Sequence, residues 1–138
     1  MSVWLRRFPR TLEAAGGARG FLRDLLSSRI PPVVLDDVIL LTSELAMNSV
    51  RHVPAAEGDW VEVSVDQGDE VLRVAVRSPG KDFARIEDPS RRGEVGGWGL
   101  HLVGALSSRW GVSPDIDGTT VWFEVDLPPV SNGRAPGP

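Results

Sequence analysis

The sequence predicts an α+β fold, a two-layer sandwich in which three helices cover one face of a mostly antiparallel five-stranded sheet. In one set of segments apolar residues alternate with polar ones, as in strands and hairpins. In another set they recur with helical spacing. Uninterrupted alternation of single strands and helices is missing, which counts against a dinucleotide-binding Rossmann fold. At 138 residues, the chain has the length of about one domain.

Five segments have the pattern of strands. A weak alternation of Val3, Leu5 and Phe8 with arginines predicts an edge strand over residues 3–10, with these three residues on its apolar side. Strict alternation predicts one hairpin from residues 60–66 and 71–77, and a second from residues 110–116 and 119–127. Together these segments account for the sheet.

Three segments have the pattern of helices. The first is predicted from Thr11, as a capping residue, to about residue 28, and the second follows Pro31-Pro32 over residues 34–53. The third opens at Trp98 and is predicted to run to about residue 109. The buried stripe of the second helix is expected to be Val34, Val38, Leu41 and Leu45, and that of the third Leu102, Val103 and Leu106.

Composition excludes several classes of protein. The net charge of −4 gives no basic footprint for nucleic acid, and without cysteine there is no disulfide framework or thiolate metal site. The apolar runs are too short to span a bilayer, and the N-terminus has no apolar signal region. The sequence contains no nucleophile-elbow motif, so it gives no support for a small-molecule hydrolase. We therefore expect a cytoplasmic protein that binds neither membrane nor nucleic acid directly.

Glu44 and Asn48 are the first candidate site residues. They lie one turn apart on the second predicted helix, beside its apolar stripe. A carboxylate and an amide oxygen in this arrangement offer a base and a hard ligand, which suit Mg²⁺ and a phosphate-bearing molecule. The alternative is an ordinary amphipathic helix on which Glu44 is solvated.

A long segment without periodicity, residues 78–97, leads into the third helix. Loops of this length are commonly lids or binding loops, and a disordered insert is the alternative. Its last residues include Gly96 and Gly97, and Gly99 follows directly. Glycines at a helix N-terminus let backbone N–H groups approach an anion, although they also occur in plain turns.

Three separated segments resemble motifs of the GHKL ATPase superfamily. Residues 43–52 (SELAMNSVRH) resemble its N box, residues 96–103 (GGWGLHLV) its G2 box and residues 118–123 (GTTVWF) its last motif. Within the superfamily, the chain resembles the small single-domain ATP-binding regulators that include bacterial anti-sigma-factor serine kinases. The resemblance implies the Bergerat ATP-binding fold over residues 1–128, with a lid-like loop at 78–97 and a disordered tail at 129–138.

The resemblance also implies roles for individual residues. Glu44 corresponds to the general base or water-positioning residue, and Asn48 to the ligand of Mg²⁺. Gly97, Gly99 and Leu100 correspond to backbone contacts to the phosphates of ATP.

This sequence departs from the family at a residue that would bind the base of the nucleotide. Thr120 corresponds to a hydroxyl near the adenine, and Ser78 and Gly80 correspond to the turn that binds the adenine amino group. The family has an aspartate where this chain has Ser78. Exchanging a charged acceptor for a neutral hydroxyl costs roughly 1 to 2 kcal/mol, or about ten- to thirtyfold in affinity.

Two functions follow from the resemblance. The first is an ATP- and Mg²⁺-dependent serine kinase and transcription regulator that binds a sigma factor or an antagonist protein and phosphorylates it. The second is a nucleotide-free interaction module of the same fold, which the serine at position 78 favours. Dimers are common among the relatives, so a homodimer is one expected assembly.

Overall fold

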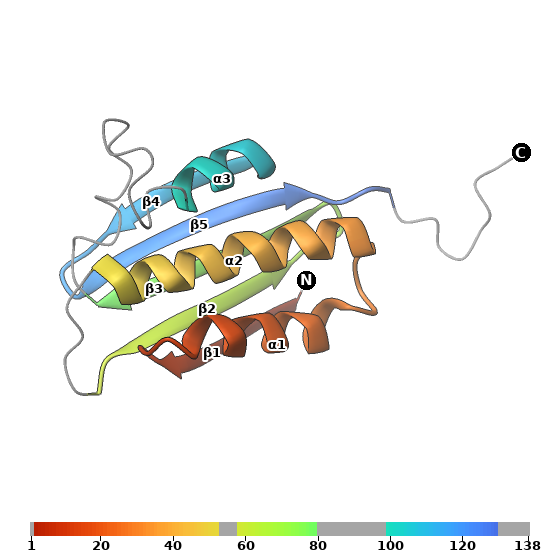
Figure 1. The fold of residues 1–138 in the computed structure, drawn as a ribbon. Coiled ribbons are helices and arrows are strands. Elements are labelled where there is room, and N and C mark those ends of the chain that lie inside the picture. The colour runs from red at the N-terminus through yellow and green to blue at the C-terminus, as the bar shows by residue number, and fades with distance from the viewer. Residues whose placement is uncertain (1, 53–57, 80–98, 130–138) are drawn as a thin grey trace, which may run out of the picture.

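The computed structural model describes residues 2–52, 58–79 and 99–129, and these residues form three helices and five strands (Figure 1). In chain order the elements are β1 (Ser2–Pro9), α1 (Ala14–Leu26), α2 (Pro32–His52), β2 (Trp60–Gln67), β3 (Val71–Pro79), α3 (Gly99–Leu106), β4 (Arg109–Pro114) and β5 (Gly118–Asp126).

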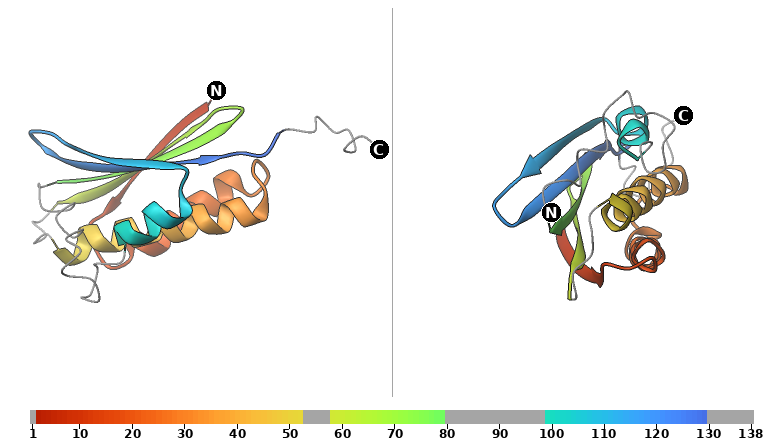
Figure 2. Two further views of the ribbon diagram at one scale, coloured as in Figure 1. Left: turned by 90° about the horizontal axis from the view of Figure 1, so that it is seen from above. Right: turned by 60° about the vertical axis from the view of Figure 1, so that its left-hand side comes forward.

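The strands form one sheet in the order β1-β2-β3-β5-β4, and every neighbouring pair is antiparallel. All three helices lie on the same face of this sheet, with α2 between α1 and α3 (Figure 2). The predicted fold class is therefore confirmed. The strand over residues 2–9 is at the edge of the sheet, as the sequence predicts.

The core lies between α2 and the alternate residues of the central strands. On α2, Val38, Leu41 and Leu45 are fully buried, whereas Val34 is only half-buried. The strand residues of the same core are Val61, Val63, Val65, Leu72, Val74, Val76, Val121 and Phe123, all fully buried. Because strand side chains alternate between faces, the residues between these point to the helix-free face.

The helix-free face is covered by ion pairs. Arg109 Nε donates to Glu124 Oε1 at 2.7 Å, and the same carboxylate accepts from Arg73 at 3.4 Å. The hydrogen bond from Arg109 lowers the pKa of Glu124. At the edge near the β4–β5 turn, Arg77 donates to Asp115 and lowers the pKa of that carboxyl to about 2.

The first strand differs in detail from its prediction. Val3 and Leu5 were expected on the apolar side, but they are 65% and 58% exposed on the helix-free face. Trp4 and Phe8 pack against the core instead. Phe8 lies so close to α1 that a β-carbon at Gly17 would be 2.8 Å from its ring, so glycine permits this contact.

A buried arginine follows β1. The Arg10 side chain is 1% exposed, and its Nη1 donates to Asp59 Oδ2 at 2.9 Å. Its Nε and Nη2 are buried and have no hydrogen-bond partner among the residues that the structure describes. The ion pair ties the end of β1 to the residue that precedes β2.

Both outer helices are shorter than predicted. Helix α1 begins at Ala14, and the Thr11 hydroxyl donates to Glu13 Oε2 at 2.8 Å instead of capping the helix. Helix α3 ends at Leu106, where the Ser107 hydroxyl donates to the Val103 carbonyl oxygen. Leu106, predicted to be buried, is 36% exposed because the chain turns away there into β4.

The predicted lid-like loop at 78–97 lies outside the described residues, apart from its first two residues, which belong to β3. The predicted disordered tail at 129–138 lies outside them from residue 130 onward. None of the helices in the described ranges combines the length and apolarity needed to cross a bilayer.

Candidate functional site

Four segments meet at one end of the molecule, the left side of Figure 1. They are the C-terminal half of α2, the end of β3, the start of β5 and the N-terminus of α3 (Figures 1 and 2). The strand register joins two of them directly, because Ser78 is paired with Thr119 and Pro79 with Gly118. This end therefore brings together the N-box helix and the entry of the third helix, which are about fifty residues apart in the sequence.

Asn48 is the most unusual residue at this end. It is fully buried, and within the described ranges neither its Oδ1 nor its Nδ2 has a hydrogen-bond partner. Leaving an amide in this state costs about 1 to 3 kcal/mol. Glu44 lies one turn earlier on the same helix and is half-buried.

Two hydroxyls on α2, those of Thr42 and Ser49, are also buried with no hydrogen-bond partner in the described part of the chain. A hydroxyl is a small group that can rotate toward a backbone carbonyl one turn back in a helix. The carboxamide of Asn48 needs both a donor and an acceptor, and this backbone contact cannot supply both. Asn48 is therefore the stronger indication of a missing ligand.

Ser78 and Thr119 form the floor of the site. Both are fully buried, and both continue the helix-facing rows of their strands, after Val76 and before Val121. The Ser78 hydroxyl contacts the Pro79 carbonyl oxygen at 3.4 Å, which is long for a hydroxyl donor. The strands approach so closely here that a β-carbon at Gly118 would lie 2.4 Å from the Ser78 carbonyl oxygen.

Thr120 requires a correction. The sequence resemblance gave it the hydroxyl near the adenine, but Thr120 is paired with Arg77 and lies on the helix-free face. Thr119, and not Thr120, lies beside Ser78 on the helix-covered face of the sheet. The sequence could have shown this, because β5 alternates strictly. Thr119 lies two residues before Val121 and four before Phe123, so all three side chains point to the same face.

The glycine turn is described only in part. Gly80 and Gly97 lie outside the described residues. Gly99 is the first residue of α3, and Leu100 follows in its first turn. The first backbone N–H groups of a helix have no partner inside it, so this helix entry has the chemistry for binding an anion.

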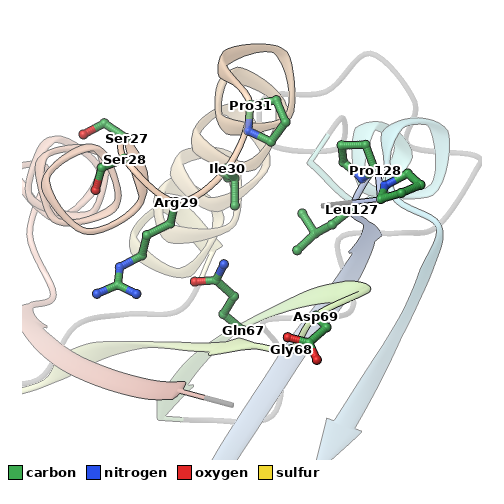
Figure 3. A pocket seen from close by; sticks show the side chains of 11 residues that line it. Ser27, Ser28, Arg29, Ile30, Pro31, Gln67, Gly68, Asp69, Leu127 and Pro128 are labelled. Carbon is green, nitrogen blue, oxygen red and sulfur yellow. The ribbon is translucent and has the colours of Figure 1, made fainter. Parts of the chain in front are cut away.

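Two other features limit where a ligand would bind. Within the ranges described, no three His, Cys, Asp or Glu side chains gather into a metal site of their own. A hollow of about 380 Å³ lies at the opposite end of β3, between the α1–α2 turn, the β2–β3 turn and the residues after β5 (Figure 3). Ile30, Gln67 and Leu127 line it, and none of the predicted site residues does.

Comparison with known proteins places this arrangement in a family. A sequence model of the histidine kinase-like ATPase domain matches residues 8–125, which is most of the chain. The chain belongs to the histidine kinase-like ATPase family. This membership confirms the resemblance to the GHKL superfamily, and it implies ATP binding.

A solved structure shares the fold of this ATPase domain. It contains the RsbU and RsbW domains of Rv1364c from Mycobacterium tuberculosis, and it superposes with a TM-score of 0.72 at 21% sequence identity. The match covers 94% of this chain and 33% of the other, so the ATPase domain spans about a third of that protein's solved chain. A comparison with curated proteins gave no match.

Proposed function

We propose that this chain is a cytoplasmic, ATP-binding regulator of transcription that works by binding a sigma factor or an antagonist protein, as an anti-sigma-factor serine kinase does. Family membership and the shared fold with a structure that contains RsbU and RsbW domains support the proposal. The observation that carries it is Asn48, at the end where α2, β3, β5 and α3 meet, because its buried amide has no hydrogen-bond partner among the described residues.

The donor set at this end fits a nucleotide with Mg²⁺. Asn48 Oδ1 would hold the metal, and Nδ2 would donate to a phosphate oxygen, so that both unpartnered atoms would be used. Mg²⁺ is commonly held by one or two protein ligands together with phosphate oxygens, so it does not require a cluster of carboxylates or imidazoles, and the described residues hold none. When bound, the ion would neutralise charge on the phosphates.

Glu44 and the helix entry complete the site. Glu44, one turn from Asn48, would accept the proton of an attacking hydroxyl or hold that hydroxyl in line. The backbone at Gly97, Gly99 and Leu100 would bind the phosphates at the positive end of α3. Ser78, with Gly80 after it, and Thr119 would bind the base from the floor of the site.

Calorimetric titration with ATP and Mg²⁺ tests the proposal. We expect binding by the wild-type chain, and its loss in Asn48→Ala. The matched control is Gln67→Ala, which removes an amide at the opposite end and should leave ATP binding unchanged. Equal affinity in Asn48→Ala and the wild type would refute the site.

Phosphate transfer needs a separate measurement. Labelled ATP is incubated with the chain and a candidate antagonist protein, in the wild type and in Glu44→Gln. Transfer that depends on Glu44 supports the serine kinase. Binding of ATP without transfer limits the function to nucleotide-dependent capture of the partner.

The second candidate function is a nucleotide-free interaction module. Ser78 favours it, since a neutral hydroxyl stands where the family has a charged acceptor for the adenine. A wild-type chain that binds its protein partner but gives no heat with ATP, while Ser78→Asp does bind ATP, would establish this second function.

A further inference from the structure

The hydroxyl of Ser78 has unused hydrogen-bonding capacity in a buried place. Its one contact in the described part of the chain is the 3.4 Å approach to the Pro79 carbonyl oxygen, although the residue is fully buried. A hydroxyl offers one donor and two acceptor lone pairs, whereas an ionised carboxylate only accepts. Ser78 is therefore able to meet either a donor or an acceptor.

The strands around Ser78 supply no fixed charge that would choose between these two options. Its partner in the register, Thr119, is a second buried hydroxyl. The charged residues nearby on β3 and the β4–β5 turn, Arg77 and Asp115, lie on the helix-free face and are hydrogen-bonded to each other. The floor of the site is thus neutral.

Purines differ in what they present at position 6. Adenine has an amino group, which donates, and guanine has a carbonyl oxygen, which accepts. A site with an acceptor alone rejects the carbonyl, because two lone pairs would then face each other without a proton. A hydroxyl rotates its proton away from an amino group or toward a carbonyl oxygen.

We propose that Ser78 relaxes the base specificity of this chain, so that the site binds 6-oxopurine nucleotides as well as ATP. The proposal rests on the proposed function, since it requires the nucleotide base to lie over Ser78 and Thr119. It names the ligand class as purine nucleoside triphosphates in general.

The test compares ATP with inosine triphosphate in the presence of Mg²⁺. Inosine lacks the 2-amino group of guanine, so its base differs from adenine only at the edge formed by N1 and C6, where it has a carbonyl at position 6 and a proton on N1. We expect the two dissociation constants of the wild type to agree within about tenfold, since each base makes one neutral hydrogen bond. In Ser78→Asp, we expect ATP to be preferred by about thirtyfold or more.

Two further variants keep the test decisive if Ser78→Asp does not fold, which circular dichroism will show. Ser78→Ala removes the hydroxyl and should weaken ATP and inosine triphosphate by similar factors, each about three- to tenfold. Thr120→Ala is the matched control, because it removes a hydroxyl on the helix-free face and should leave both affinities unchanged.

Failure of this inference is distinguishable from failure of the proposed function. A wild type that binds ATP at least a hundredfold more tightly than inosine triphosphate overturns the relaxed specificity and leaves ATP binding intact. Unequal losses in Ser78→Ala also overturn it. A wild type that binds neither nucleotide overturns both proposals.

Discussion

Replacing Asn48 by leucine separates the stability of this chain from its function. Leucine has the same number of side-chain heavy atoms and nearly the same shape as asparagine, but it has no polar groups. Since both polar atoms of Asn48 are buried without partners in the part of the chain that the structure describes, removing them should recover about 1 to 3 kcal/mol. We therefore expect Asn48→Leu without nucleotide to be more stable than the wild type, by about 4 °C in Tm for each kcal/mol.

Nucleotide should reverse the order of the two proteins. A ligand at a hundred times its Kd stabilises the folded state by about 2.7 kcal/mol, and Asn48→Leu would not receive this contribution. Urea unfolding with and without Mg²⁺ and ATP measures both effects, and an unchanged m-value confirms that the folded and unfolded states are comparable. Leu45→Ala is the control for ordinary core damage, since Leu45 is also fully buried on α2, and it should cost about 2 to 5 kcal/mol in both conditions.

Two results would refute this reasoning. If Asn48→Leu without nucleotide is less stable than the wild type by more than about 1 kcal/mol, the amide is paired in the folded protein. If Mg²⁺ and ATP stabilise the variant as much as the wild type, Asn48 is not part of the nucleotide site.

Three further predictions concern the scaffold. Gly17→Ala should destabilise the chain by about 1 kcal/mol or more, because the new β-carbon would lie 2.8 Å from the ring of Phe8. Gly20→Ala has open space around it and should stabilise α1 by about 0.5 to 1 kcal/mol. Urea unfolding measures the free energy of unfolding of both variants. Asp59→Ala should cost about 3 kcal/mol in the same assay, because its arginine partner is 1% exposed and would be left uncompensated. Asp115 has a pKa of about 2 in the folded state, below its unfolded value. Its stabilising contribution is therefore complete above about pH 4 and is lost as the pH falls toward 2. In Asp115→Asn, the free energy of unfolding should depend less on pH in this range.

Much of the fold was predictable because its signals are local. Period-two alternation predicted both hairpins, and the helical spacing of Val38, Leu41 and Leu45 predicted the buried face of α2. These patterns report which face of an element is buried, and that is set by the residues themselves. The prediction that Val3 and Leu5 lie on the apolar side of the first strand was wrong. An edge strand has one neighbour, and its short apolar pattern specifies only weakly which face is buried.

Element ends were harder to predict, since they depend on distant partners. Ser78 was expected in the segment without periodicity at 78–97, but pairing with Thr119 extends β3 through Ser78 and Pro79. Proline is tolerated there because it is the last residue of the strand. The face of Thr119 was encoded in the alternation of β5, whereas the lack of hydrogen-bond partners for Asn48 is a property of the packed structure alone.

The energetics of Asn48 bear on the choice between the two candidate functions. A nucleotide-free module would keep this fold without help from a ligand, because Ser78 is held by strand pairing and needs no charge to stay in place. Such a module would gain stability by exchanging Asn48 for leucine, since the buried amide costs free energy and binds nothing. An ATP-binding chain retains the amide because a ligand satisfies it. The unsatisfied carboxamide therefore favours nucleotide binding, and under our proposal Ser78 changes which purine is bound without abolishing the site.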